Sequence, residues 1–168
     1  PSAPAAPAVV RFAAWMMFLM AAPLLLRAEA PPAPAPIGQL VQLESTINSE
    51  TFTRISRTAL NLKQRGEQMG TQPVLILQIQ DGTSRYGDVR ELAKFLASDI
   101  PQVRTIAWIP KDLRGINGML ALACHEIVMA PTAGFGDLGR GAPVDPDMQA
   151  FILGLVGQRR NPLLSDPL

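Results

Sequence analysis

The chain has 168 residues and a formal net charge of +1, with 17% charged and 48% apolar residues. Residues 1–36 hold 8 of the 16 prolines and only three charged side chains, so the other 132 residues carry 13 basic and 13 acidic groups. A neutral body lacks the basic surface that nucleic acids and anionic lipids require. The single cysteine and single histidine exclude an internal disulfide and a multi-histidine or cysteine-rich metal cluster. We expect no nucleic-acid partner, no metal and no cofactor.

The first thirty residues are typical of a secretory signal peptide. Arg11 precedes fifteen uncharged, mostly apolar residues, 12–26, and Ala28-Glu29-Ala30 has the small-x-small form of a cleavage site. Fifteen residues rise only about 22 Å as a helix, less than the roughly 30 Å hydrocarbon core of a membrane. An uncleaved anchor is the alternative. Residues 31–36 alternate proline with alanine and predict an extended linker to a domain over 37–168.

These features predict a secreted or cell-envelope (periplasmic) protein, with membrane anchoring as a further option. The chain starts without methionine, and we expect it to be a fragment of a longer protein. Tethering then runs through the N-terminal segment or through a region beyond Leu168.

The body alternates strand and helix patterns. Apolar runs predict strands at 40–43, 74–79, 105–109 and 127–130. Helical spacing and capping residues predict helices from Ser49 to about Arg65, from Asp88, over 117–124, and from Asp145 or Asp147 to Val156. Strands connected through helices predict an α/β fold with a mainly parallel sheet, and the apolar strands predict helices on both of its faces.

The carboxyl ends of parallel strands are where ligands of such sheets gather. In this chain those ends fall at 81–87, 110–117 and 131–139. We expect any functional site at this edge.

An ordered series of motifs runs through the body. Residues 120–131 read Leu-Ala-Leu-Ala-Cys-His-Glu-Ile-Val-Met-Ala-Pro, a glycine loop follows at 135–139, and Arg159-Arg160-Asn161 follows the last predicted helix. Together with the strands at 74–79 and 105–109, this series resembles the ClpP/crotonase superfamily, in particular the NfeD-type membrane-associated ClpP-class serine proteases. The likeness covers about 37–161. It implies a ClpP/crotonase-like layered fold, an affinity for peptides, and assembly into trimers or larger rings.

The catalytic residues of that family do not carry over. Where the family has Ser-Ala-Gly at the start of a short helix, this chain has Ile116-Asn117-Gly118, and a hydrocarbon side chain cannot attack a carbonyl. The base of the NfeD type is a lysine, but the last lysine here is Lys111. The Pro-Gly-Gly turn that helps form the oxyanion hole reads Gly82-Thr83-Ser84. The resemblance thus implies a serine-peptidase homologue with no catalytic residue of its own.

Binding a peptide in a groove does not require the catalytic residues. The backbone N–H of Asn117 corresponds to an oxyanion donor of the family, and neighbouring glycines keep the local backbone permissive. The partners we expect are an extended peptide, bound by strand addition, or a segment of a membrane protein, besides further copies of this chain. The candidate groove residues are Gly82, Thr83, Ser84, Gly115, Ile116, Asn117 and Gly118.

Three alternatives remain open. An active peptidase with a displaced site would use Ser84 with His125, but the topology predicts these two at opposite edges of the sheet. We interpret His125 as a helix-end residue facing the helix dipole, and Cys124 as a small buried apolar residue.

The second alternative is a crotonase-like acyl-CoA enzyme, which shares the fold; the signal peptide and the lost glycines near Thr83 argue against it. The third is an oligomerisation module in which Phe151, Ile152 and Leu155 face a neighbour.

Overall fold

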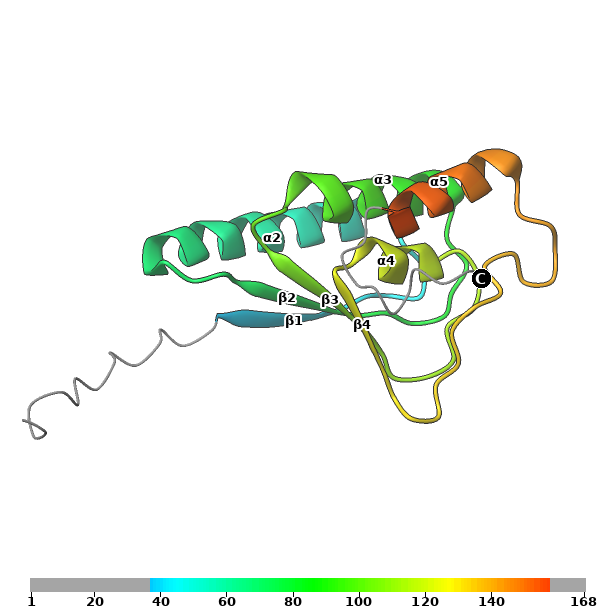
Figure 1. The fold of residues 1–168 in the computed structure, drawn as a ribbon, viewed down its shortest axis with the longest axis horizontal. Helices are drawn as coiled ribbons and strands as arrows, with labels where there is room; N and C mark the ends of the chain where they lie inside the picture. Colours follow the sequence, from blue (N-terminus) through cyan, green and yellow to red (C-terminus); the bar gives the residue numbers. More distant parts are fainter. Residues whose placement is uncertain (1–36, 158–168) are drawn as a thin grey trace, which may run out of the picture. The chain divides into compact units, whose positions relative to one another are not determined.

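The computed structural model describes residues 37–157. The predicted signal peptide, the linker and the Arg-Arg-Asn motif lie outside these residues. Figure 1 shows the elements in this order: β1 (Gly38–Gln42), α2 (Ser49–Met69), β2 (Val74–Gln78), α3 (Tyr86–Lys94) with its π-helical continuation η1 (Phe95–Asp99), β3 (Arg104–Ile109), α4 (Gly118–Ala123), β4 (Glu126–Met129) and α5 (Pro146–Gly157).

The four strands form one parallel sheet in the order β1-β2-β3-β4. Leu40 of β1 lies beside Ile76 of β2, which lies beside Ile106 of β3. Each strand reaches the next through a helix, as parallel pairing requires. The predicted α/β fold with a mainly parallel sheet flanked by helices is confirmed.

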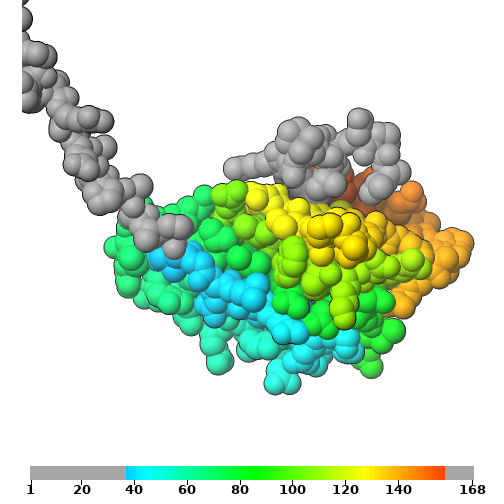
Figure 2. Space-filling model, turned by 90° about the horizontal axis from the view of Figure 1, so that it is seen from below, coloured from blue at the N-terminus to red at the C-terminus, as the bar shows by residue number. Residues whose placement is uncertain are grey.

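The helices cover only one face of the sheet. In Figure 1 α2, α3, α4 and α5 all lie on the same side of the strands. Leu75 and Leu77 of β2 point into that helical side and are fully buried, whereas the alternate residue Ile76 is only partly buried and Leu40 of β1 is 58% exposed. Figure 2 looks onto the uncovered face. The prediction of helices on both faces is therefore wrong for the described residues.

The N-cap of helix α2 is not the residue that the sequence predicts. The side chain of Asn48 accepts a hydrogen bond from the N–H of Thr51 at 2.9 Å, so Asn48, not Ser49, is the N-cap. The helix runs past Gly66 to Met69 and ends at Gly70, whose left-handed φ of +63° caps it. Gly66 packs so closely on Pro73 that an added Cβ would lie 2.6 Å from the proline ring.

Helix α3 also begins earlier than predicted, at Tyr86, and its N-cap residue, Arg85, makes no side-chain capping bond. Asp88 lies in the first turn, where its negative charge favours the helix dipole. The inward residues are those the spacing predicts: Val89, Leu92 and Leu96 are fully buried.

Helix α4 is the most deeply buried element, since all six of its residues are buried. It packs between α3, α5 and β3. This position places the start of α4 at the carboxyl edge of the sheet, against the loops that follow β1 and β2. No helix between residues 37 and 157 is long and apolar enough to cross a membrane.

Candidate functional site at the carboxyl edge of the sheet

Four loops meet at the start of α4: the loops that follow β1, β2, β3 and β4. The loops after β3 and β4 run side by side, because the N–H of Leu113 donates to Gly134 O at 2.8 Å and the N–H of Gly115 donates to Asp137 O at 3.0 Å. The seven predicted groove residues all lie on the β2 loop or at the start of α4. The structure therefore brings together two segments that are more than thirty residues apart in the sequence.

Asn117 joins three of these loops through its side chain. Its amide nitrogen Nδ2 donates to Ser45 O at 3.0 Å and to Gln80 O at 3.2 Å, and its Oδ1 accepts from the hydroxyl of Ser84 at 2.6 Å. The residue is fully buried. Both donor hydrogens and one acceptor site of the amide are satisfied by protein groups. The side chain therefore holds the loops together at this edge of the sheet.

Ser84 is held on both sides by the same network. Its Oγ accepts a hydrogen bond from the N–H of Ile47 at 2.8 Å while it donates to Asn117. A serine activated for attack would instead donate to a basic nitrogen or a carboxylate. The partner here is a neutral amide oxygen, which is too weak a base to take the proton.

The loops after β1 and β2 touch at Gly82. A Cβ built on Gly82 would lie 1.6 Å from the carbonyl oxygen of Ser45, so only glycine allows the two backbones to approach this closely. The first residue of the predicted Gly82-Thr83-Ser84 turn is therefore in contact with another loop.

The loop after β4 covers the other side of the edge. The side chain of Arg140 forms an ion pair with Asp81, donates to Gly82 O at 3.1 Å, and lies across Gly115, whose φ is +74°. Leu138 packs on the first turn of α4, where a Cβ on Gly118 would be 2.5 Å from its methyl group.

Ile116, the residue at the predicted nucleophile position, is partly buried and packs against the hydrophobic core. Beyond Asn117, the N–H groups of Gly118, Met119 and Leu120 donate to the carbonyl groups three residues earlier, at 3.0, 3.0 and 3.1 Å. These turn bonds use the first free donors of α4 within the chain.

A hollow of about 510 Å³ lies beyond the end of β1. Its lining includes Gln42, Ser45, Arg54 and Gln80, and none of the seven predicted groove residues. It borders the network because Asn117 is bonded to the carbonyls of both Ser45 and Gln80.

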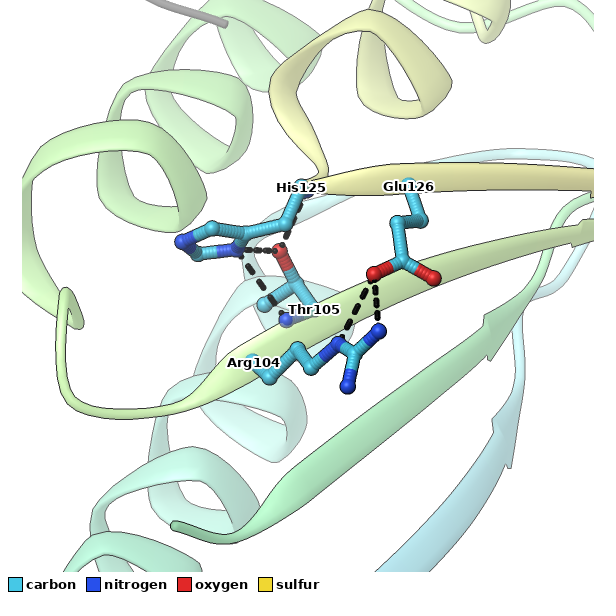
Figure 3. Close-up of polar contacts among 4 residues, drawn as sticks. All are labelled: Arg104, Thr105, His125 and Glu126. Carbon is cyan, nitrogen blue, oxygen red and sulfur yellow. Dashed lines mark hydrogen bonds and ion pairs between the residues drawn. The ribbon is translucent and has the colours of Figure 1, made fainter. Parts of the chain in front are cut away.

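Ser84 and His125 lie at opposite edges of the sheet, as predicted, and at opposite ends of α4. Ser84 bonds Asn117, which precedes α4, whereas His125 follows Cys124, which ends it. Figure 3 shows His125 beside the start of β3: its Nδ1 lies 3.1 Å from the N–H of Thr105, from which it accepts, and 2.8 Å from the hydroxyl of Thr105. The sequence did not predict this contact between the ring nitrogen of His125 and the backbone of β3.

An ion pair next to His125 also joins β3 and β4. Glu126 of β4 pairs with Arg104 of β3, with the guanidinium Nε at 2.8 Å (Figure 3). Asp137, in the loop after β4, accepts from the N–H of Gly141 at 2.7 Å. Cys124 is buried, as predicted, and its thiol donates to Leu120 O at 3.2 Å. Across residues 37–157 no group of three metal-ligating side chains occurs.

Sequence reasoning assigned a role to the backbone of Asn117 and missed its side chain. A signal was present: Asn117 is the one polar side chain in an otherwise apolar or glycine segment over 115–123. The ion pair between Arg140 and Asp81 could not be predicted from the sequence, because the two residues are 59 positions apart and both belong to polar loops.

No protein-family model and no curated protein matches this chain. Among solved structures, ThnE from S. clavuligerus is similar with a TM-score of 0.49 and 16% identity over 73% of this chain and 58% of that one. A putative enoyl-CoA hydratase/isomerase from Bordetella parapertussis has a TM-score of 0.47 and 16% identity, over 77% and 64%. The chain therefore spans less than two thirds of the length of either structure. Likeness at this level gives no argument about activity.

Proposed function

We propose that this chain is a degenerate ClpP/crotonase-like domain that binds or scaffolds and does not catalyse. The observation that carries the proposal is the buried amide of Asn117, which makes three hydrogen bonds to the loops after β1 and β2 at the edge where a reacting group would have to enter. A substrate carbonyl placed there would have to displace these bonds. The superfamily assignment itself comes from the sequence motifs. No comparison supports the narrower NfeD-type assignment.

The acid–base chemistry of the described residues supports the same proposal. Ser84 faces an amide, Asp81 is paired with Arg140, and the single histidine bonds Thr105 at the far end of α4. General acid–base catalysis needs a titratable group within hydrogen-bond reach of the reacting atom. Each of these three side chains is already bonded to another group of the chain.

In this proposal an extended peptide binds along β1. Within 37–157 this strand pairs only with β2, so its outer edge offers backbone donors and acceptors for strand addition. The strand leads into the hollow lined by Gln42 and Arg54, which would receive the peptide's next side chain. Of the seven predicted groove residues, Asn117 bonds two residues of this lining, Ser45 and Gln80. Homo-oligomer formation and an envelope location are part of the same proposal and come from the sequence alone.

Catalysis is tested with the full chain and with two matched variants, Ser84→Ala and Thr83→Ala. Each is incubated with casein, a peptide library and a serine-directed phosphonate, and we expect no turnover and no labelling. Activity of the full chain that is lost in Ser84→Ala and retained in Thr83→Ala would establish an active peptidase with a displaced site and overturn the proposal.

Peptide binding is tested by amide hydrogen exchange with the library present. We expect slower exchange at the backbone of Gly38–Gln42 and unchanged exchange in β4. Protection confined to other elements would contradict binding along β1.

Acyl-CoA chemistry is the second candidate to test. One similar solved structure is a putative enoyl-CoA hydratase/isomerase, and the substrates of that protein are the class to test. Calorimetric titration of CoA thioesters into the full chain decides the matter. We expect no heat of binding, and saturable heat with turnover would replace the scaffold by an acyl-CoA enzyme.

A further inference from the structure

A groove of about 350 Å³ lies between α3, its continuation η1, and α5. Its apolar lining includes Ala97, Phe151 and Leu155, and two cations, Arg90 and Lys94, belong to the same lining. The volume is in the range of small-molecule sites, which starts at about 300 Å³, and it is too small to enclose a protein helix.

Helix α5 gives the groove its apolar character. Asp147 is its only charged residue, and from Ala150 to Gly157 the helix has no polar side chain. Only Leu155 is fully buried, while Leu153 is 63% exposed. A helix that is apolar all round is normally covered on several sides, so α5 has apolar surface to spare.

The two cations of the groove have no acidic partner among the described residues. The ion pairs of residues 37–157 use the side chains of Arg54, Arg104 and Arg140. Arg90 and Lys94 stand four residues apart on α3, a spacing at which like charges repel. An anion between them would remove this repulsion.

Stacking holds Arg90 in place. Its guanidinium carbon lies 5.2 Å from the centroid of the Phe151 ring and 5.8 Å from that of Tyr86. Stacking on an aromatic face leaves the edge of the guanidinium plane free to donate hydrogen bonds to a carboxylate or phosphate. The cation and the apolar floor of the groove are thus joined at Phe151.

We propose that this groove binds an anionic amphiphile with a short apolar tail and a carboxylate or phosphate head. The tail lies on Ala97, Phe151 and Leu155. The head accepts hydrogen bonds from Arg90 and Lys94. The groove is built from different residues from those at the carboxyl edge, and the proposal does not depend on whether that edge is catalytic.

Binding is measured on the full chain by NMR of isotope-labelled alanine and leucine methyl groups. The probes are octanoate, octyl phosphate and neutral octanol, below their micelle-forming concentrations. We expect saturable shifts at Ala97, Ala150 and Leu155 with the two anions, and at least tenfold weaker binding of octanol. Whichever anion binds more tightly identifies the head group. Equal affinity for octanol, or shifts spread over other elements, would overturn the proposal.

Variants separate the two parts of the site. Arg90→Gln with Lys94→Gln should weaken anion binding at least tenfold and leave octanol binding unchanged. Gly154→Leu should abolish binding, because a Cβ on Gly154 meets nothing within 4 Å and the new side chain fills the groove without a clash. Gly157→Leu is the matched control: this position is equally open but does not line the groove, and binding should be retained. Unchanged binding in Gly154→Leu would refute this location.

Discussion

The amide of Asn117 makes more side-chain hydrogen bonds than any other described residue at the carboxyl edge, and each of them crosses between loops. Buried polar groups that lose their partners pay the cost of desolvation without compensation. Removing the side chain of Asn117 should therefore destabilise this edge more than removing the hydroxyl of Ser84.

We expect Asn117→Ala to lower the free energy of unfolding by about 3 kcal/mol, since it leaves two carbonyl groups and one hydroxyl without their partner. Ser84→Ala should cost about 1 kcal/mol. Urea unfolding followed by circular dichroism measures both. Thr83→Ala is the control: Thr83 is exposed, and a change within about 0.5 kcal/mol is expected. An Asn117→Ala effect no larger than the control would show that the network does not hold the edge.

The double variant of Asn117 and Ser84 adds a further check. Because the two side chains share a hydrogen bond, their effects should not be additive. Additive losses would mean that the 2.6 Å contact contributes nothing to stability.

Two glycines near the β2 loop behave differently on substitution. Gly82→Ala forces apart the loops after β1 and β2, because the new methyl group would meet Ser45 O at 1.6 Å, and a loss of about 3 kcal/mol is expected. Gly87→Ala, in α3, meets nothing within 4 Å and should raise stability by up to about 1 kcal/mol through helix propensity. Thermal unfolding of both variants measures this difference. Equal effects would contradict the close approach of the two loops.

At the scale of elements, the sequence predicted the existence and type of every strand and most boundaries to within a few residues. Apolar runs located β2 and β3, and an alanine- and leucine-rich segment was correctly assigned to a helix, α4. The predicted boundaries were wrong where tertiary contacts determine the end of an element. The helix was predicted to end at about Arg65, but Gly66 lies inside α2, where the nearby ring of Pro73 leaves no room for a side chain.

The contact between β3 and β4 offers a comparison of a buried and an exposed interaction (Figure 3). Thr105 is fully buried, and its hydroxyl bonds both the ring and the backbone N–H of His125. We expect Thr105→Val to cost about 2 kcal/mol. Glu126→Gln, which breaks an exposed ion pair with Arg104, should cost less than about 1 kcal/mol, and the loss should shrink further in high salt. Chemical denaturation at two salt concentrations measures both. A larger loss in Glu126→Gln would contradict this ranking.

At the scale of the whole molecule, the sequence indicated that the strands are buried, but it did not indicate which elements cover them. Ile76 and Ile106 read as residues of strands covered on both faces, yet the described helices pack against the opposite face. The site was limited in the same way. The edge of the sheet followed from topology, whereas the bonds from Asn117 to Ser45 and Gln80 depend on loop paths that no periodic pattern specifies.

Cys124 is a probe for the cooperativity of the whole described domain. It is the single cysteine of the chain and is only 1% exposed, behind the fully buried helix α4. A thiol reagent can react only when the protein opens, so labelling should be slow in the folded chain and fast in urea.

Destabilising the distant carboxyl edge should then speed labelling at the other end of α4. If Asn117→Ala costs about 3 kcal/mol, the population of the open form, and with it the labelling rate, should rise on the order of a hundredfold, because each 1.4 kcal/mol is a factor of ten. Thr83→Ala should label at the rate of the unaltered chain. Rapid labelling of the unaltered chain, or a rate that does not change in Asn117→Ala, would mean that α4 opens by itself. The side chain of Asn117 would then not stabilise the core to which α4 belongs.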